Sequence, residues 1–144
     1  MAQLIEEGHE IGNHLTEDRW SIWLSEAELR EDVTEAGKIL ARFALIRWLR
    51  PGGGFYSHAI LKIAAENGYR VVLGSVFPYD THIPSVWFAS RFILARTRPG
   101  DILVLHDGGA RGDRTAKTLS QILPQLQRRG YEIVSLSTLV DSAL

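Results

Sequence analysis

The chain has 144 residues, of which 45% are hydrophobic and 23% charged, a composition typical of one globular domain spanning residues 1–144 and not of a disordered chain. Its 16 basic and 17 acidic residues give a formal net charge of -1, which offers no broad attraction for nucleic acid or an anionic membrane. Cysteine is absent, so disulfides, thiolate metal ligands and a cysteine nucleophile are excluded. No apolar run reaches the roughly 20 residues of a membrane span, and no secretory signal pattern opens the chain.

The first third of the chain predicts two helices and two strands. Ala2 to Glu7 has the character of a helix end, because the glycine that follows can supply a left-handed cap. Glu10 to Asn13 is predicted to be a short strand. Ser25 begins a helix in which Glu28 completes a capping box and apolar residues recur at helical spacing. Ile46 to Leu49 is predicted to be a strand, which ends at a proline and three glycines.

Helices and strands alternate through the rest of the chain. The predicted elements are, in order, a helix over His58–Asn67, a strand over Arg70–Leu73, a helix from Ser85 to about Arg96, a strand over Asp101–Leu105, a helix over Thr115–Arg129 and a strand over Glu132–Leu136. Such alternation predicts parallel strands covered by helices. Catalytic residues in α/β folds lie in the loops after the carboxyl ends of the strands, here 13–23, 50–56, 74–83 and 106–112.

Four segments in and around these loops resemble motifs of the polysaccharide deacetylase family, the NodB-homology domain of carbohydrate esterase family 4, which includes chitin and peptidoglycan deacetylases. They are Gly8–His14, Arg50–Pro51, Val71–Asp80 and Ile102–Asp107. Several short matches in the right order are far more specific than one alone, and together they cover nearly the whole chain. The resemblance implies an α/β fold: an incomplete (β/α)7-type barrel with about five parallel strands, lacking roughly the first two.

His14 matches the first of two metal-binding histidines in the family, and Asp18 stands where the second would be. A carboxylate oxygen can bind zinc at about the same distance as an imidazole nitrogen. The resemblance therefore implies a divalent metal held by His14 and Asp18, with zinc first and manganese or cobalt as alternatives. The family's first strand also carries two aspartates, the base and a metal ligand, which have no match here. The shortened chain would then not necessarily retain the metal.

Four residues match catalytic positions of the family. Arg50 matches an arginine that orients the catalytic aspartate through a charge-assisted pair, and the backbone N–H of Gly53 would by position donate to the oxyanion. His106, at the end of an apolar strand, matches the histidine that acts as general acid, and Asp80 matches an aspartate of the acid's charge environment. The structural alternatives are a permissive turn for Gly53, a surface ion pair for Arg50 and an ordinary strand-end hydrogen bond for His106.

Aromatic side chains can stack on the apolar faces of sugar rings, and the candidates are Trp20, Trp23, Phe55 and Tyr56 in the predicted loops, together with Trp87. Trp87 lies within a predicted helix near other apolar residues and is expected to pack in the core. A zincin helix is excluded, because its two histidines must lie four residues apart, whereas the histidines of the first motif lie five apart across Gly12–Asn13.

These residues together imply hydrolysis of N-acetyl groups on an amino-sugar polysaccharide, with a carbohydrate polymer or oligosaccharide as substrate. The missing base could be restored by strands on a longer native chain, which we favour, or replaced by Asp18 or Asp107. The alternative is a noncatalytic carbohydrate-binding pseudo-deacetylase. A flavodoxin-like binding module has little support, since no glycine-rich phosphate loop opens a helix.

The expected barrel has two consequences. Exposed strand edges favour self-association, so we expect a homo-oligomer, rearranged edges or a poorly soluble chain. His14, Asp18, Arg50 and His106 are expected to converge on one pocket at the strand ends. The family resemblance suggests an extracytoplasmic location, although this chain shows no signal peptide.

Overall fold

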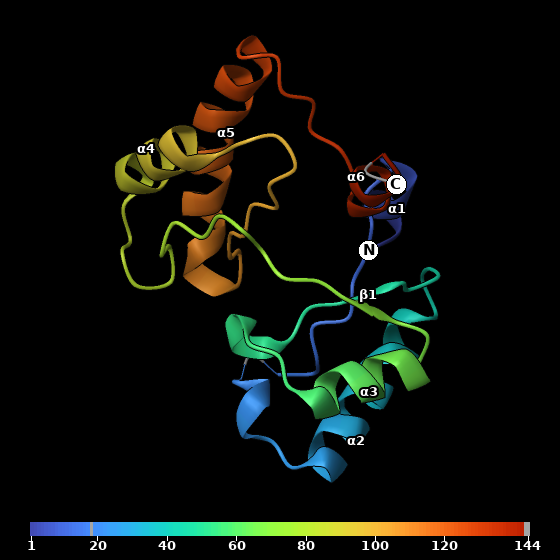
Figure 1. The fold of residues 1–144 in the computed structure, drawn as a ribbon. Coiled ribbons are helices and arrows are strands. Elements are labelled where there is room, and N and C mark those ends of the chain that lie inside the picture. The colour runs from blue at the N-terminus through green and yellow to red at the C-terminus, as the bar shows by residue number, and fades with distance from the viewer. Residues whose placement is uncertain (18, 143–144) are drawn as a thin grey trace. The chain divides into compact units, whose positions relative to one another are not determined.

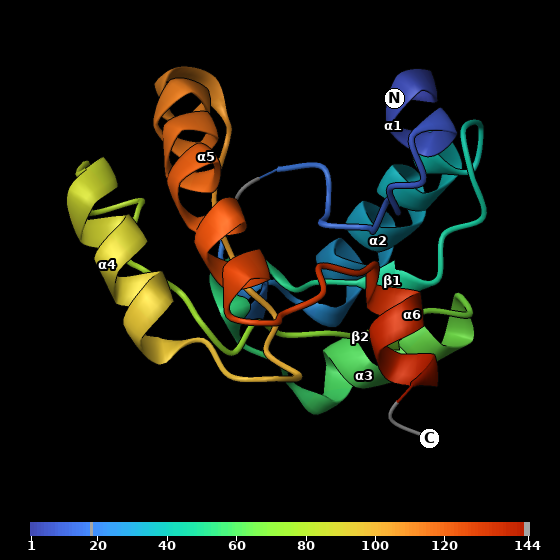
Figure 2. The same ribbon diagram turned by 90° about the horizontal axis from the view of Figure 1, so that it is seen from above.

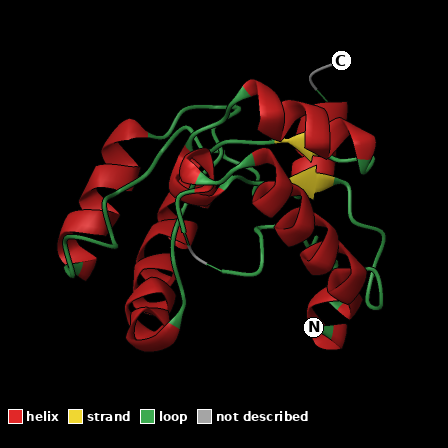
Figure 3. Cartoon of the chain, turned by 90° about the horizontal axis from the view of Figure 1, so that it is seen from below, coloured by secondary structure: helices red, strands yellow, loops and turns green. Residues whose placement is uncertain are grey.

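The computed structural model describes residues 1–17 and 19–142, which form two compact units, Met1–Leu73 and Gly74–Leu144. The first unit contains, in chain order, α1 (Ala2–Glu6), α2 (Glu26–Leu40), β1 (Trp48–Leu49), α3 (His58–Glu66) and β2 (Arg70–Val71) (Figure 1). The second contains α4 (Val86–Arg96), α5 (Gly112–Arg128) and α6 (Leu136–Asp141). Helices and loops make up most of the chain (Figure 3). Among the described residues, no helix is long and apolar enough to cross a membrane.

The predicted helices are confirmed, because their starts depend on local chemistry that the sequence displays. The hydroxyl of Ser25 accepts the backbone N–H of Glu28 at 3.3 Å, and the Glu28 carboxylate accepts the N–H of Ser25 at 2.9 Å, which completes the predicted capping box of α2. Serines also cap α3, α4 and α6. Helix α5 begins at Gly112, three residues before its predicted start, and α6 is an addition to the predicted set.

The strands pair in parallel, as predicted for an α/β fold. In β1 and β2, Trp48 lies opposite Arg70 and Leu49 opposite Val71. Asn13 forms a parallel bridge to Leu49, so the predicted strand at Glu10–Asn13 is reduced to its last residue. In the second unit a parallel bridge joins Val76 to Leu103, which is all that forms of the predicted strand at Asp101–Leu105. Closure into a (β/α)7-type barrel stays a prediction.

The predicted strand at Glu132–Leu136 is wrong. Residues 132–135 are irregular, and Leu136 begins α6, where the hydroxyl of Ser135 accepts the N–H of Thr138 at 3.3 Å. A strand needs a neighbour to take its backbone hydrogen bonds, and the described part of the chain shows no such ladder for 132–135. The apolar pattern alone did not reveal that the partner is missing.

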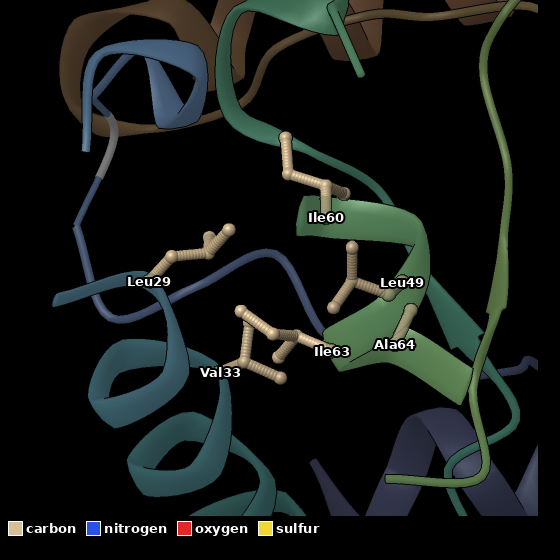
Figure 4. Close-up of a cluster of buried hydrophobic side chains, with 6 residues drawn as sticks. All are labelled: Leu29, Val33, Leu49, Ile60, Ile63 and Ala64. Atoms are coloured by element: carbon tan, nitrogen blue, oxygen red, sulfur yellow. The ribbon is translucent and has the colours of Figure 1, made fainter. Parts of the chain in front are cut away.

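The core of the first unit lies between α2, α3 and β1. Apolar side chains from these three elements point toward one another in Figure 4, and each is almost fully removed from solvent. The cluster comprises Leu29, Val33, Leu49, Ile60, Ile63 and Ala64. Leu29 and Val33 are four residues apart, and Ile63 and Ala64 follow Ile60 by three and four residues, as the sequence pattern predicts for one buried face.

The second unit has its own core, formed where α4 and α5 lie side by side (Figure 2). Its fully buried members are Val76, Ile93, Ile122 and Leu126. This core holds the segment around Val76 and Leu103 against the two helices, and the chain immediately beyond that segment carries Asp80 and His106.

Candidate functional site

The loop that carries His14 is fixed by Asn13, which is completely buried. The backbone N–H of Asn13 donates to the carbonyl of Trp48 at 2.8 Å, and its carbonyl accepts the N–H of Arg50 at 2.9 Å. Its side-chain oxygen accepts the N–H of Leu15 at 2.9 Å, while its amide nitrogen donates to a carbonyl of α2. Leu15 has a φ of +68°, which is unusual for a residue with a Cβ, and the bond to Asn13 helps to hold this conformation just after His14.

His14 and Arg50 are in direct contact. Nδ1 of His14 lies 2.6 Å from the carbonyl oxygen of Arg50. A carbonyl only accepts, so Nδ1 carries the proton of this hydrogen bond, which leaves Nε2 as the ring nitrogen that could act as a ligand. Metal-binding histidines are usually oriented in this way, by a hydrogen bond from the other ring nitrogen to a carbonyl or carboxylate. The orientation of His14 therefore fits a metal ligand that binds through Nε2.

The described residues do not by themselves form a complete metal site. Asp18, the second predicted ligand, lies outside the described residues. Within 1–17 and 19–142, no three His, Cys, Asp or Glu side chains are grouped so that they could hold an ion. A catalytic zinc usually has three protein ligands and a water molecule. The structure thus offers one suitably oriented candidate ligand, His14.

Asp32, on α2, is a residue of this loop region that no motif indicated. It is buried, and its carboxylate accepts the backbone N–H of Thr16 at 2.6 Å, the hydroxyl of Thr16 at 2.5 Å and the guanidinium of Arg19 at 3.3 Å. Burial alone would raise the pKa of the Asp32 carboxyl, but the hydrogen bonds from Thr16 and Arg19 outweigh it and hold the pKa below its usual value. The sequence did contain one sign that Asp32 is buried: it lies between Leu29 and Val33, on the apolar side of α2.

We expect Asp32→Asn to lower the free energy of unfolding by about 1.5–3 kcal/mol at neutral pH, because it removes a buried charged acceptor from three hydrogen bonds. Since the pKa of Asp32 is lowered in the folded chain, its contribution is present above the ordinary carboxyl pKa and is lost as the pH falls through the lowered value. Urea unfolding at pH 7 and near pH 3 measures this. The exposed Glu31→Gln on the same helix is the control, and an equal effect at both pH values would contradict the assignment.

Gly52–Gly54 form a tight turn that packs against residues 19–21, in the second half of the loop that carries His14. A Cβ on Gly52 would lie 2.0 Å from the carbonyl oxygen of Arg19, so the close approach requires glycine there. Gly53 has a φ of +75°, in the left-handed region that favours glycine, and the ring of Trp20 packs against it. The turn therefore has a structural reason to be glycine-rich, and the role of the Gly53 amide as an oxyanion donor stays a prediction.

The four aromatic side chains predicted to stack on sugars are all exposed: Trp20, Trp23, Phe55 and Tyr56. The rings of Trp20 and Phe55 lie next to each other, with centroids 5.5 Å apart. The 3-10 helix Ser21–Trp23 contacts the Gly52–Gly54 turn, which places these aromatic residues close to Gly53. An exposed aromatic surface of this kind is compatible with carbohydrate binding.

The expectation that Trp87 packs in the core is wrong. Its side chain is 69% exposed, and the guanidinium of Arg91 lies over its ring at 5.6 Å from the centroid. Helix α4 instead buries the face that carries Ala89, Ser90 and Ile93. Apolar residues occur around most of this helix, so its sequence does not identify the buried face.

In the second unit, parallel pairing brings two loop residues to the same end of neighbouring segments. The N–H of Val76 donates to Ile102, and the N–H of Val104 donates to Val76 at 2.9 Å. Both segments run in the same direction, so the residues that follow them, Asp80 and His106, lie beyond the same edge.

Asp80 and His106 are joined by two kinds of hydrogen bond. The backbone N–H of His106 donates to Oδ2 of Asp80 at 2.7 Å, and Nδ1 of the His106 ring lies 3.0 Å from Oδ1. The side chains are 20% and 12% exposed, so the pair is largely shielded but still accessible. Because a carboxylate only accepts, Nδ1 carries a proton and Nε2 is the ring nitrogen available for proton exchange. The hydroxyl of Thr115 donates to the carbonyl of His106 at 2.5 Å and fixes the backbone as well.

The structure therefore groups the predicted site residues in two sets. His14, Arg50 and Gly53 belong to the first unit, and His14 bonds directly to Arg50. Asp80 and His106 belong to the second unit and bond to each other. Their catalytic and metal-binding roles, and the convergence of both sets on one substrate, stay predictions.

Comparison with known sequences agrees with the motifs. The family model for polysaccharide deacetylase matches residues 1–72. A peptidoglycan-N-acetylglucosamine deacetylase of Bacillus cereus is 36% identical over 143 residues, covering 97% of this chain and 67% of the relative. A chitooligosaccharide deacetylase of Bradyrhizobium is 33% identical over 153 residues, covering 96% of this chain and 70% of the relative.

Solved structures show the same fold at lower identity. A family 4 acetyl xylan esterase from Clostridium thermocellum, in complex with a cobalt ion, matches with a TM-score of 0.84 and 24% identity, over 96% of this chain and 67% of that chain. A CE4 family pseudoenzyme from Bacillus anthracis matches with a TM-score of 0.85 and 20% identity, over 96% of this chain. The match spans 48% of the pseudoenzyme chain.

Proposed function

Because this chain belongs to the polysaccharide deacetylase family of hydrolases, we propose that it removes N-acetyl groups from the amino sugars of a chitin- or peptidoglycan-like polymer. The observation that carries the proposal is the Asp80–His106 pair, because hydrolysis of an amide needs a proton donor for the departing amine. In the reaction the oxygen of water joins the acetyl carbon, the C–N bond breaks, and acetate and a free amine are released.

His106 is the general acid in this proposal. Asp80 accepts a hydrogen bond from Nδ1–H and prevents the ring from turning, so the protonated ring presents its second proton at Nε2. As the C–N bond breaks, this proton passes from Nε2 to the sugar nitrogen, and the neutral ring remains hydrogen-bonded to Asp80. A positioned histidine is suited to this step because its ordinary pKa lies close to neutral pH.

The first unit is proposed to hold the acyl group. The backbone N–H of Gly53 donates to the oxygen that becomes negative as water adds to the acetyl carbon. The proton of water would pass to the carboxylate of Asp18 or Asp107, or to an aspartate of a longer native chain, and the side chain of Arg50 orients that carboxylate. A divalent metal, zinc by preference and manganese or cobalt otherwise, would take Nε2 of His14 as one ligand and Asp18 as another.

Acetate release from chitotetraose and from purified peptidoglycan tests the proposal. The full chain is freed of metal by chelation and assayed with and without added zinc, cobalt or manganese, and bound metal is measured after gel filtration. We expect acetate release that depends on added metal, and a loss of bound metal in His14→Gln. His9→Gln, at an exposed histidine five residues earlier, is the matched control.

The alternative is a noncatalytic carbohydrate-binding protein. The exposed rings of Trp20 and Phe55 favour it, because stacking on a sugar needs neither a metal nor a base. In that case calorimetry would show that the chain binds chitotetraose, while the acetate assay would give no product with any of the three metals and the wild-type chain would hold no stoichiometric metal. That result would overturn the proposed hydrolysis.

A further inference from the structure

Two arginines line a small hollow beside the Asp80–His106 pair. Arg111 ends the 3-10 helix Gly109–Arg111, and Arg114 lies in the first turn of α5. Both line a hollow whose wall also includes Asp80, Ile83, Thr115 and Thr118. Neither arginine matches a residue quoted from the deacetylase motifs.

These arginines have no counterion in the described part of the chain. Both are half-buried, yet neither guanidinium makes a hydrogen bond or an ion pair with a described residue. Arg30, by contrast, is bound to two carboxylates, those of Glu26 and Glu66. A partly buried cation without a partner loses hydration and gains nothing in return, so a bound anion would be stabilising.

The backbone that carries the two arginines is held against His106. The hydroxyl of Thr115 donates to the carbonyl of His106, which ties the first turn of α5 to the proposed acid. Gly112, between the two arginines, approaches the carbonyl of Asp107 so closely that a Cβ there would lie 3.1 Å from it. The backbone segment that carries Arg111 and Arg114 is therefore tied to the backbone of His106 and Asp107.

Charge and size restrict what the hollow can bind. Two arginines against one aspartate leave one positive charge in excess, and the Asp80 carboxylate is already occupied by His106. The hollow is open to solvent and has room for about one water molecule. A pyranose ring must stay outside, whereas a small planar anion at the rim could bond to both guanidiniums, whose geometry matches a carboxylate.

We propose that Arg111 and Arg114 bind a carboxylate carried by the glycan, so that the chain prefers acidic amino-sugar polymers to neutral chitin. This inference rests on the proposed function and names its substrate class. The carboxylate could belong to the lactyl ether of a muramic acid residue or to a uronic acid, and both present the same planar anion.

Three disaccharides of equal length separate the possibilities. N,N'-diacetylchitobiose is neutral, the peptide-free disaccharide of N-acetylglucosamine and N-acetylmuramic acid carries a lactyl carboxylate, and a hyaluronan disaccharide carries a uronic acid. Dissociation constants are measured by calorimetry with the full chain at 50 and 300 mM salt. We expect at least one acidic disaccharide to bind about tenfold more tightly than chitobiose, with the preference reduced at high salt. The acidic sugar that shows the preference identifies the source of the carboxylate.

The variant Arg111→Gln/Arg114→Gln should lose this preference and keep the wild-type affinity for chitobiose. Lys117→Gln/Arg128→Gln removes the same charge from exposed positions of α5 and should keep the preference. Two results would overturn the inference: the wild-type chain binds all three sugars equally, or the arginine variant retains the preference. In either case, acetate release in the earlier assay would show that the proposed function still stands. If no disaccharide binds and no acetate is released, the proposed function fails together with the inference.

Discussion

His106→Gln is expected to lower the rate of acetate release by about 10²- to 10⁴-fold, the usual contribution of a positioned general acid. Glutamine cannot give a proton to the departing amine, although it can still donate a hydrogen bond to Asp80. The loss should therefore appear in kcat, while glycan affinity changes little, because binding does not require the transferred proton. Steady-state kinetics on chitotetraose and on peptidoglycan fragments measure both quantities.

The matched control for this variant is His58→Gln. His58 is the first residue of α3 and is exposed, so the same chemical change there should leave the rate within about twofold of wild type. Circular dichroism and urea unfolding of both variants show whether the fold is retained. A folded His106→Gln chain with nearly wild-type kcat would remove His106 from the role of acid.

Ile63→Ala is expected to lower the free energy of unfolding by about 2–5 kcal/mol. Ile63 has no exposed surface and lies at the centre of the cluster in Figure 4, between α2 and β1. The substitution removes apolar contact and leaves a cavity, because neighbours held by α2 and β1 can close only part of the space. Urea unfolding followed by circular dichroism gives the change in midpoint.

Leu61→Ala, on the same helix, is the control for this core prediction. Leu61 is 42% exposed, so its loss should cost much less, about 0.5 kcal/mol or below. Equal effects of the two substitutions would mean that α3 does not bury the face that contains Ile60, Ile63 and Ala64. The assignment of the first unit's core would then be wrong.

The helices could be predicted because their signals are local. The serine that caps α2 and its partner Glu28 are three residues apart, so the sequence alone displays the whole device. Strands depend on partners that are distant in the chain, and only short parts of those expected near Asn13 and Leu103 find one. The expected strand at Glu132–Leu136 fails for the same reason.

The residues of the candidate site also divide into those that the sequence identifies and those that only the folded chain reveals. Asp80 and His106 were identified from motifs, and their direct hydrogen bond agrees with a shared environment. Asp32 and the two arginines beside Asp80 could not be identified in this way, because their importance comes from contacts made only in the folded chain. The bond from His14 to the Arg50 carbonyl is likewise a tertiary contact that residue types alone do not predict.

A single deacetylase site requires that the His14 group and the Asp80–His106 pair act on the same sugar. Nuclear magnetic resonance of histidine-labelled protein, assigned with His→Gln variants and titrated with chitotetraose, tests it directly. We predict that the ring signals of His14 and His106 shift together with one dissociation constant, while those of His9 and His58 stay in place. Shifts of only one of the first two signals, or two different dissociation constants, would contradict a single deacetylase site.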